Sequence, residues 1–177
     1  MNIESSPEFS RIIRADQLPD HDAEFNFEAE PAERDKLAIR FSLQSLNRLQ
    51  ARVWARRIGG SPVVRVRVNF VADVLQSCVV TLDPVAAHID EWFELEFSPA
   101  DGIGATEEVI FEADDDDPPE EMVGGQFDIG EAISEHLALS LDDYPRKPGV
   151  EFSDQIEHAD ERASADSPFA VLRDNQK

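Results

Sequence analysis

The side chains that could act as nucleophiles or as acid–base catalysts are scattered along this sequence. Cys78 is the single cysteine, and it stands in the apolar run Ser77-Cys78-Val79-Val80, where a free cysteine usually packs as a small core residue. No local signature pairs it with a histidine base. The 38 Asp and Glu residues offer no distinguished acid–base pair, and a solvated acidic surface is the simpler interpretation. The sequence therefore predicts a protein that is not an enzyme and has no catalytic residue.

Metal and cofactor sites are not expected either. A single cysteine excludes zinc sites built on paired thiolates, and the four histidines, at positions 21, 88, 136 and 158, lack the spacing of a ligand pair. The run Asp114–Asp117 lacks the glycine and the terminal glutamate that a calcium loop requires. Gly59-Gly60 and Gly124-Gly125 are turn signals, because no phosphate-loop lysine or dinucleotide pattern accompanies them.

Charge is distributed unevenly along the chain. The formal net charge is −22, which argues against an ordinary nucleic-acid-binding protein because nucleic-acid backbones are polyanions. Residues 34–67 nevertheless hold nine basic residues and one acid, whereas residues 68–143 hold twenty-one acids and no lysine or arginine. Either these segments form two solvated faces that neutralise each other, or the molecule presents one face to an anionic partner and another to a cationic partner.

Four arginines of the basic segment are predicted to share one surface. Two runs with period-two alternation, residues 48–56 and 64–70, flank the turn signal Gly59-Gly60-Ser61-Pro62 and predict a β-hairpin. Like charges across a hairpin are unfavourable unless an anion faces them, and that anion is either an RNA or the acidic half of the same chain. The candidate RNA-binding residues, all expected on the solvent-facing side of the hairpin, are Arg52, Arg56, Arg65 and Arg67.

Further strands are expected on both sides of this hairpin. Residues 25–29 alternate between apolar and polar side chains, strand-like sequence continues from Val71 through Leu82, and residues 85–97 alternate as one long strand. Residues 109–111 suit a short edge strand. Residues 1–22 are polar, contain two prolines, and are predicted to form a loosely ordered leader.

Two helices are expected. The first spans residues 31–39, with Pro31 at its first position and apolar residues at helical spacing. The second begins at a capping box formed by Asp128 and Glu131, and it ends before the prolines at positions 145 and 148. Its apolar stripe consists of Ile129, Ile133, Leu137 and Leu141.

These elements predict an α+β fold, in which a curved, partly barrel-like antiparallel sheet of about five to seven strands packs against the two helices. The domain is expected to span residues 23–149 and to include a mobile acidic loop over residues 112–126, most acidic at 112–121. Residues 150–177 are expected to be a flexible tail with an apolar plug at 168–172. The candidate contacts with a protein partner are Asp114, Asp115, Asp116, Asp117, Tyr144, Arg146, Lys147, Phe169 and Leu172.

The sequence also indicates the cellular compartment in which the protein is expected. It shows no signal peptide and no apolar stretch of about 20 residues that could span a bilayer. A single cysteine excludes an intramolecular disulfide framework. We therefore expect a cytoplasmic protein without membrane contact.

Five segments, taken in order, carry a family resemblance. They are Gln76-Ser77-Cys78-Val79-Val80-Thr81-Leu82-Asp83-Pro84, Phe127-Asp128-Ile129-Gly130-Glu131, Glu135-His136-Leu137-Ala138-Leu139, Asp142-Asp143-Tyr144-Pro145-Arg146-Lys147-Pro148-Gly149 and Pro168-Phe169-Ala170-Val171-Leu172. Together they resemble the YceD family, the large ribosomal RNA subunit accumulation proteins. Their order and separation are similar to those of the alphaproteobacterial branch, and they span most of residues 20–172.

The resemblance implies a non-enzymatic, cytoplasmic factor that supports the accumulation or processing of large-subunit ribosomal RNA and ribosome assembly, without a cofactor. Its partner would be large-subunit ribosomal RNA or a pre-ribosomal particle, with a basic ribosomal protein as a further partner. Many relatives carry a Cys-x-Arg-Cys-type segment where this chain has Cys78-Val79-Val80-Thr81. The second cysteine and the arginine are missing here, so no metal or thiol role is carried over.

Two modes of action remain open at this point. In the first, the four arginines contact RNA, and the acidic half limits non-specific RNA binding by repulsion. In the second, the acidic segment 112–121 holds a basic ribosomal protein, and the chain is an acidic protein-binding adaptor or chaperone without direct RNA contact. Electrostatic complementarity favours the second mode for so anionic a chain. Charge reversal of the arginines should abolish the first activity, and neutralising Asp114–Asp117 should abolish the second.

Overall fold

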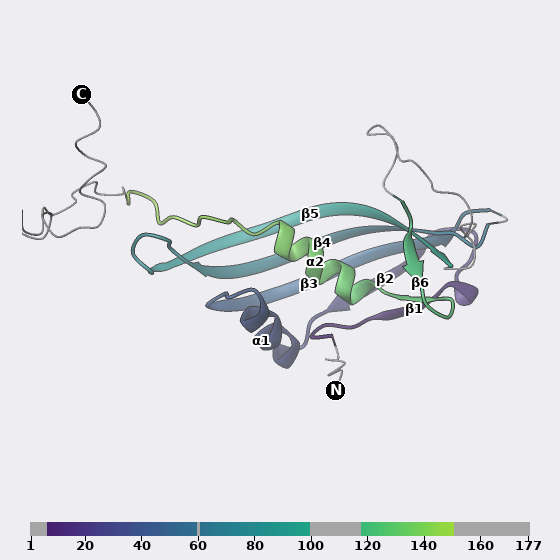
Figure 1. Cartoon of the computed structure of the whole chain (residues 1–177), viewed down its shortest axis with the longest axis horizontal. Helices are drawn as coiled ribbons and strands as arrows, with labels where there is room; N and C mark the ends of the chain where they lie inside the picture. The colour runs from purple at the N-terminus through teal and green to yellow at the C-terminus, as the bar shows by residue number, and fades with distance from the viewer. Residues whose placement is uncertain (1–6, 60, 100–117, 151–177) are drawn as a thin grey trace, which may run out of the picture. The chain divides into compact units, whose positions relative to one another are not determined.

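The computed structural model describes residues 7–59, 61–99 and 118–150. Residues 7–59, 61–99 and 118–147 belong to one compact unit. The segments predicted at 109–111, 114–117 and 168–172 lie outside the described residues. The elements (Figure 1) are β1 (Ile12–Arg14), a 3-10 turn η1 (Ala15–Gln17), β2 (Ala23–Glu28), α1 (Pro31–Arg40), β3 (Ser45–Arg57), β4 (Val64–Ser77), β5 (Pro84–Pro99), β6 (Glu120–Met122), β7 (Gln126–Asp128) and α2 (Ile129–Leu139).

The main sheet has five strands in the order β2-β3-β4-β5-β6. The first four pair antiparallel, and β6 pairs parallel to β5. Strands β1 and β7 form a separate antiparallel pair. The predicted α+β class with two principal helices is confirmed. The sheet is mixed rather than wholly antiparallel, and it is open, with β2 and β6 at its edges, so the partly barrel-like shape is not confirmed.

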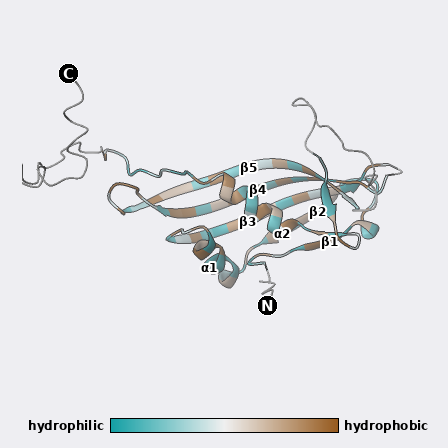
Figure 2. Cartoon of the chain, in the orientation of Figure 1, coloured by the Kyte–Doolittle hydropathy of each residue, from teal (hydrophilic) through white to brown (hydrophobic). Residues whose placement is uncertain are grey.

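The predicted hairpin is confirmed as β3 and β4, and both strands are longer than the runs that predicted them. Hydrophobic and hydrophilic residues alternate along both strands (Figure 2). Register places Val53 opposite Val68 and Ala55 opposite Val66, so the aliphatic side chains of the two strands share one face.

The strand predicted through Leu82 ends earlier, at Ser77. Residues 78–83 form a turn in which the Leu82 amide donates to the carbonyl of Cys78 at 2.9 Å and the Cys78 amide donates to the carbonyl of Asp83 at 2.8 Å. Leu82 adopts a left-handed conformation with φ of 62°, which an apolar run does not reveal. The chain then reverses, and Pro84 opens β5 rather than interrupting a strand.

Both predicted helices are present. In α1, Glu30 and Glu33 form a capping box around Pro31, and Leu37 and Ala38 are buried. In α2, the carboxylate of Asp128 accepts from the Gly130 amide at 3.0 Å, as expected of a capping residue.

The second half of the predicted α2 capping box is wrong, because the Glu131 carboxylate accepts a hydrogen bond from another element. Its Oε1 accepts a hydrogen bond from Arg40 of α1 at 2.8 Å, and this contact links the two helices. The apolar stripe of α2 is correct: Ile129, Ile133 and Leu137 are buried, and Leu141 packs against the core.

The core lies on the side of the main sheet that α2 crosses (Figure 1). Val64, Val66 and Val68 of β4 are fully buried there. Phe97 of β5 stacks on Phe127 of β7 with ring centroids 4.2 Å apart, and this contact closes one end of the core. We call this side of the sheet the covered face and the opposite side the open face.

The loosely ordered leader predicted over residues 1–22 differs from the structure over its described part. Phe9, Ile13 and Leu18 are buried in the core, and Ile13 of β1 pairs with Phe127 of β7. The spacing of these three side chains follows neither a helical nor a strand period, so periodicity does not reveal their burial.

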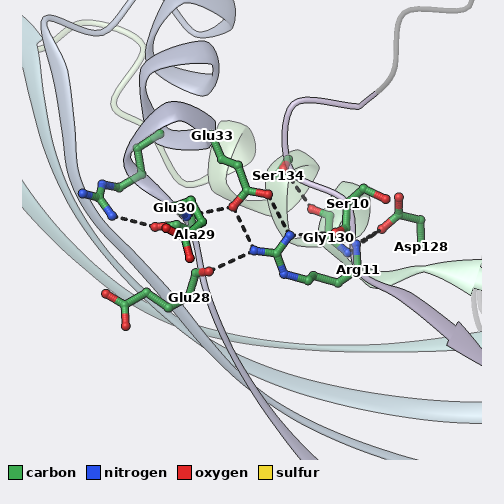
Figure 3. Close-up of polar contacts among 10 residues, drawn as sticks. Ser10, Arg11, Glu28, Ala29, Glu30, Glu33, Asp128, Gly130 and Ser134 are labelled. Atoms are coloured by element: carbon green, nitrogen blue, oxygen red, sulfur yellow. Dashed lines mark hydrogen bonds and ion pairs between the residues drawn. The ribbon is translucent and has the colours of Figure 1, made fainter.

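Arg11 fastens this N-terminal segment to three other elements (Figure 3). Its guanidinium donates to both oxygens of Glu33 in α1, at 2.7 and 2.8 Å, and to the backbone carbonyl of Glu28 at 3.0 Å. Its backbone amide donates to Asp128 at 2.7 Å. The hydrogen bond from Arg11 is the main reason why the pKa of Glu33 lies below its ordinary value.

The loop predicted over residues 112–126 contains ordered pairing at its end. Glu120–Met122 form β6 beside β5, and Gln126 begins β7. Met122 is buried and anchors this short strand despite the acids that precede it. Burial raises the pKa of Glu120, and nearby Glu135 raises it further.

Candidate nucleic-acid interface

The open face of the sheet holds the four arginines that the sequence predicts on one surface. Each lies at a position that alternates with a buried aliphatic residue of β3 or β4, so the predicted placement of the side chains is confirmed. The two helices contribute their buried residues to the core on the covered face, and the open face is left to solvent and charged side chains. Strand alternation alone therefore positions Arg52, Arg56, Arg65 and Arg67.

Carboxylates on the neighbouring strands face these arginines. The pairs are Arg52–Glu24 at 2.7 Å, Arg56–Asp22 at 3.6 Å, Arg65–Glu96 at 2.6 Å, Arg65–Glu94 at 3.3 Å and Arg67–Asp22 at 2.6 Å. An anion of the same chain thus faces each arginine, but the predicted acidic half, residues 68–143, supplies it only for Arg65. The partners of the other three arginines, Asp22 and Glu24, precede the basic segment.

The pairs follow a simple spatial rule across the sheet. The arginines stand on the adjacent strands β3 and β4, whereas the carboxylates stand on or just before β2 and β5, the strands that flank this pair. Arg56 and Arg65 are directly opposite each other, and their mutual repulsion is offset by the carboxylates on either side. Positive charge is therefore concentrated along the middle of the open face.

Both tryptophans of the chain also lie on the open face, and neither was among the predicted site residues. Trp54 of β3 and Trp92 of β5 stack with ring centroids 5.3 Å apart and an interplanar angle of 10°. Trp92 is 62% exposed. The guanidinium of Arg52 lies 5.4 Å from the centre of the Trp54 ring, within the range of a cation–π contact.

One sequence signal could have pointed to these residues. Trp54 alternates with buried residues, and Trp92 alternates with the partly buried Phe93, so the period that places the arginines outward places the indoles outward too. Their contact depends on the register of three strands, because β4 lies between them.

Two shallow hollows lie on the open face, and Trp92 lines the second of them. One, of about 350 Å³, is lined by three carboxamides and Arg52 among other residues. The carboxamides belong to Asn26, Gln50 and Asn69, and Asn69 lies directly opposite Trp92. The other hollow, of about 270 Å³, is lined by Arg67, Trp92, Phe93 and Glu94.

Arg52 and Glu24 determine the electrostatic environment of the Trp54–Trp92 pair. The hydrogen bond from Arg52 is the largest cause that holds the pKa of Glu24 below its ordinary value, and the Asn26 and Trp54 side chains contribute smaller effects. Glu24 therefore stays ionised and keeps the Arg52 side chain beside the indole.

The other predicted site residues are not brought to this face. Asp114–Asp117, Phe169 and Leu172 lie outside the described residues. Tyr144, Arg146 and Lys147 are exposed and follow α2 alongside the turn at 78–83, where the Val79 amide donates to the carbonyl of Pro145 at 2.9 Å. Lys147 pairs with Asp83 at 3.0 Å.

Cys78 is buried in that turn rather than in a strand. Its sulfur accepts a hydrogen bond from the Lys147 amide at 3.4 Å. Hydrogen bonds, first from the Thr81 side chain and then from the backbone amides of Lys147, Thr81 and Val80, lower the pKa of the thiol to about 7. The sulfur thus helps to hold the segment after α2 against the turn.

The remaining titratable groups do not converge. Within the part of the chain that the structure describes, no three His, Cys, Asp or Glu side chains are arranged to hold a metal ion. His136 of α2 stacks on Phe93 with centroids 3.7 Å apart, and burial lowers its pKa. In the described ranges, no helix is both long and apolar enough to cross a membrane.

The fold and this surface define an α+β protein whose central strands have one covered and one open face. A family model described as "Large ribosomal RNA subunit accumulation protein YceD" matches residues 66–174. The chain therefore belongs to the YceD family, as its five segments predicted, and this membership supports a role in the accumulation of large-subunit ribosomal RNA. The matched region includes Arg67 and Trp92, and Trp54 precedes it. The searches of curated proteins and of solved structures gave no match.

Proposed function

We propose that this protein supports the accumulation of large-subunit ribosomal RNA by binding rather than by catalysis, and that its open face contacts the RNA. The observation that carries the proposal is the line of four arginines along the adjacent strands β3 and β4. A chain segment that crosses β3 and β4 would pass over guanidinium groups, the side chains best suited to phosphate oxygens. We expect this binding to take place in the cytoplasm.

The acidic composition sets the strength and selectivity of such binding. Phosphates must exchange with the carboxylates that already face the arginines, so electrostatic attraction alone gives modest affinity. The remaining charge, −22 for the whole chain, repels polyanions that do not fit the face. Binding of this kind favours one RNA conformation over bulk nucleic acid.

The test is recovery of RNA and protein with the tagged full-length chain from lysate, at low and moderate salt. The variant Arg52→Glu/Arg67→Glu reverses two charges of the open face. Its matched control is Arg14→Glu/Lys36→Glu, which reverses two exposed charges on other elements. We expect large-subunit RNA with the wild type and the control and its loss with the open-face variant.

The outcomes separate the two modes of action. Equal recovery of large-subunit RNA by all three proteins would overturn the assignment of the open face. A basic ribosomal protein that stays bound after nuclease treatment, and is lost on neutralising Asp114–Asp117, would instead identify an acidic protein-binding adaptor. Circular dichroism melts of each variant establish that a loss of recovery does not reflect unfolding.

A further inference from the structure

The position of the two tryptophans is unusual for side chains of their size. The chain contains only two, and both stand on the open face instead of in the core. Tryptophan is on average highly buried, because its large apolar surface is costly to hydrate. Here a stacked pair with Trp92 62% exposed is held at the solvent surface.

The neighbours of the pair provide complementary chemistry. Register aligns Asn26, Arg52, Asn69 and Trp92 in one row across four strands, and Glu24, Trp54, Arg67 and Glu94 in the next. Carboxamides can donate and accept hydrogen bonds, as needed at the edge of a nucleobase, and the guanidinium groups of Arg52 and Arg67 can contact phosphate. An aromatic plane, carboxamides and guanidinium groups therefore meet within two adjacent rows.

These groups favour unpaired nucleic-acid bases over other partners. The bases of a duplex are stacked on each other and cannot cover an indole, whereas unpaired bases stack readily on aromatic side chains. Positive charge runs along the middle of the face beside both indoles, where the backbone of a bound strand would lie. A cationic peptide would meet this same line of arginines and would have to displace them from Glu24, Glu94 and Glu96.

We infer that Trp54 and Trp92 form a stacking platform for unpaired bases of single-stranded RNA, with Asn26 and Asn69 at the base edges. This inference rests on the proposed function and names the RNA conformation that the open face selects. Because the arginines are neutralised by carboxylates, stacking provides most of the affinity, and binding depends on salt less steeply than phosphate-driven binding does.

The test uses the intrinsic fluorescence of the full-length protein, since both tryptophans belong to the proposed platform. Short single-stranded oligoadenylate, a duplex of the same length and a lysine-rich peptide are titrated separately. We expect saturable quenching by the single strand only. By anisotropy with labelled oligoadenylate, Trp92→Ala should weaken binding roughly tenfold, and Trp92→Phe should retain most of it.

Leu139→Ala is the matched control, because Leu139 is an exposed apolar side chain on the outer side of α2. It should bind as the wild type does, and all variants should melt at similar temperatures. Equal affinity of Trp92→Ala and wild type for oligoadenylate would overturn the platform, as would equal binding of single strand and duplex. Quenching by the peptide alone would identify a basic protein segment as the partner and would also overturn it.

Failure of this inference is distinguishable from failure of the proposed function. If Trp92→Ala leaves oligonucleotide binding intact while Arg52→Glu/Arg67→Glu abolishes recovery of large-subunit RNA, the open face binds RNA without base stacking. If neither set of variants changes the recovery of that RNA, the open face is not the RNA-binding surface and both proposals fail.

Discussion

The covered and open faces of β3 and β4 are made by alternate residues of the same strands, yet their residues are fixed by different forces. On the covered face, Val64, Val66 and Val68 have no exposed surface and pack with α2 and the other core residues. On the open face, Arg65 and Arg67 stand between them and pair with carboxylates from other strands. Burial of apolar surface contributes far more to the free energy of unfolding than exposed ion pairs do. The covered face therefore stabilises the fold, whereas folding constrains the residues of the open face much less.

The largest expected effect comes from placing a charge on the covered face. Val66→Asp buries a carboxylate without a partner and should lower the free energy of unfolding by about 4 kcal/mol or more. The adjacent Arg67→Ala removes an exposed ion pair and should change it by less than about 1 kcal/mol. Urea denaturation of both variants checks this, and similar losses would contradict the assignment of the two faces.

Arg11 provides the next largest effect, because its bidentate contact ties the N-terminal segment to the covered side. Arg11→Gln should cost about 2–3 kcal/mol, since it removes charge-assisted hydrogen bonds and leaves the half-buried Glu33 with only its hydrogen bond from the Glu30 amide. Arg14→Gln is the control, because the Arg14–Asp16 pair is exposed. Equal denaturation midpoints for the two variants would show that residues 7–18 contribute little to stability.

The close approach of α2 to the N-terminal segment gives a smaller effect. A Cβ added to Gly130 would lie 2.6 Å from the carbonyl oxygen of Phe9 and 2.8 Å from the Arg11 nitrogen, both backbone atoms. Gly130→Ala should therefore destabilise the protein by about 1–2 kcal/mol, although alanine normally favours a helix. Gly59→Ala has open space around the added atom and should be neutral or better, as thermal melts can determine.

The smallest expected effect is a dependence of stability on pH that arises from His136 on the covered side. Desolvation lowers the pKa of this imidazole below its ordinary value of 6.5, and the opposing effect of Glu135 is smaller. The unfolded chain therefore binds more protons just below pH 6.5, and stability should fall as pH falls from 6.5 through the folded-state pKa. His136→Gln should flatten this part of the denaturation profile. An unchanged profile would assign the dependence to other groups.

The sequence predicted the elements that carry a regular period. The β3–β4 hairpin, the two helices and the outward placement of the four arginines follow from alternation, turn residues and helix caps. The burial of Phe9 and Ile13 could not be predicted this way, because it depends on β7 and α2, more than a hundred residues away. The Trp54–Trp92 contact was missed for a related reason, since it forms across an intervening strand and requires the register of all three.

The pairing of β1 with β7 also determines the order in which the chain can complete its fold. Ile13 pairs with Phe127, so β1 cannot complete its pairing until β7 has been synthesised. Until Asp128 and Gly130 have been made, Arg11 lacks two of its contacts and the valines of β4 lack the helix that covers them. The apolar face of β4 is therefore covered only after α2 has been synthesised, and contacts of such high sequence separation form slowly.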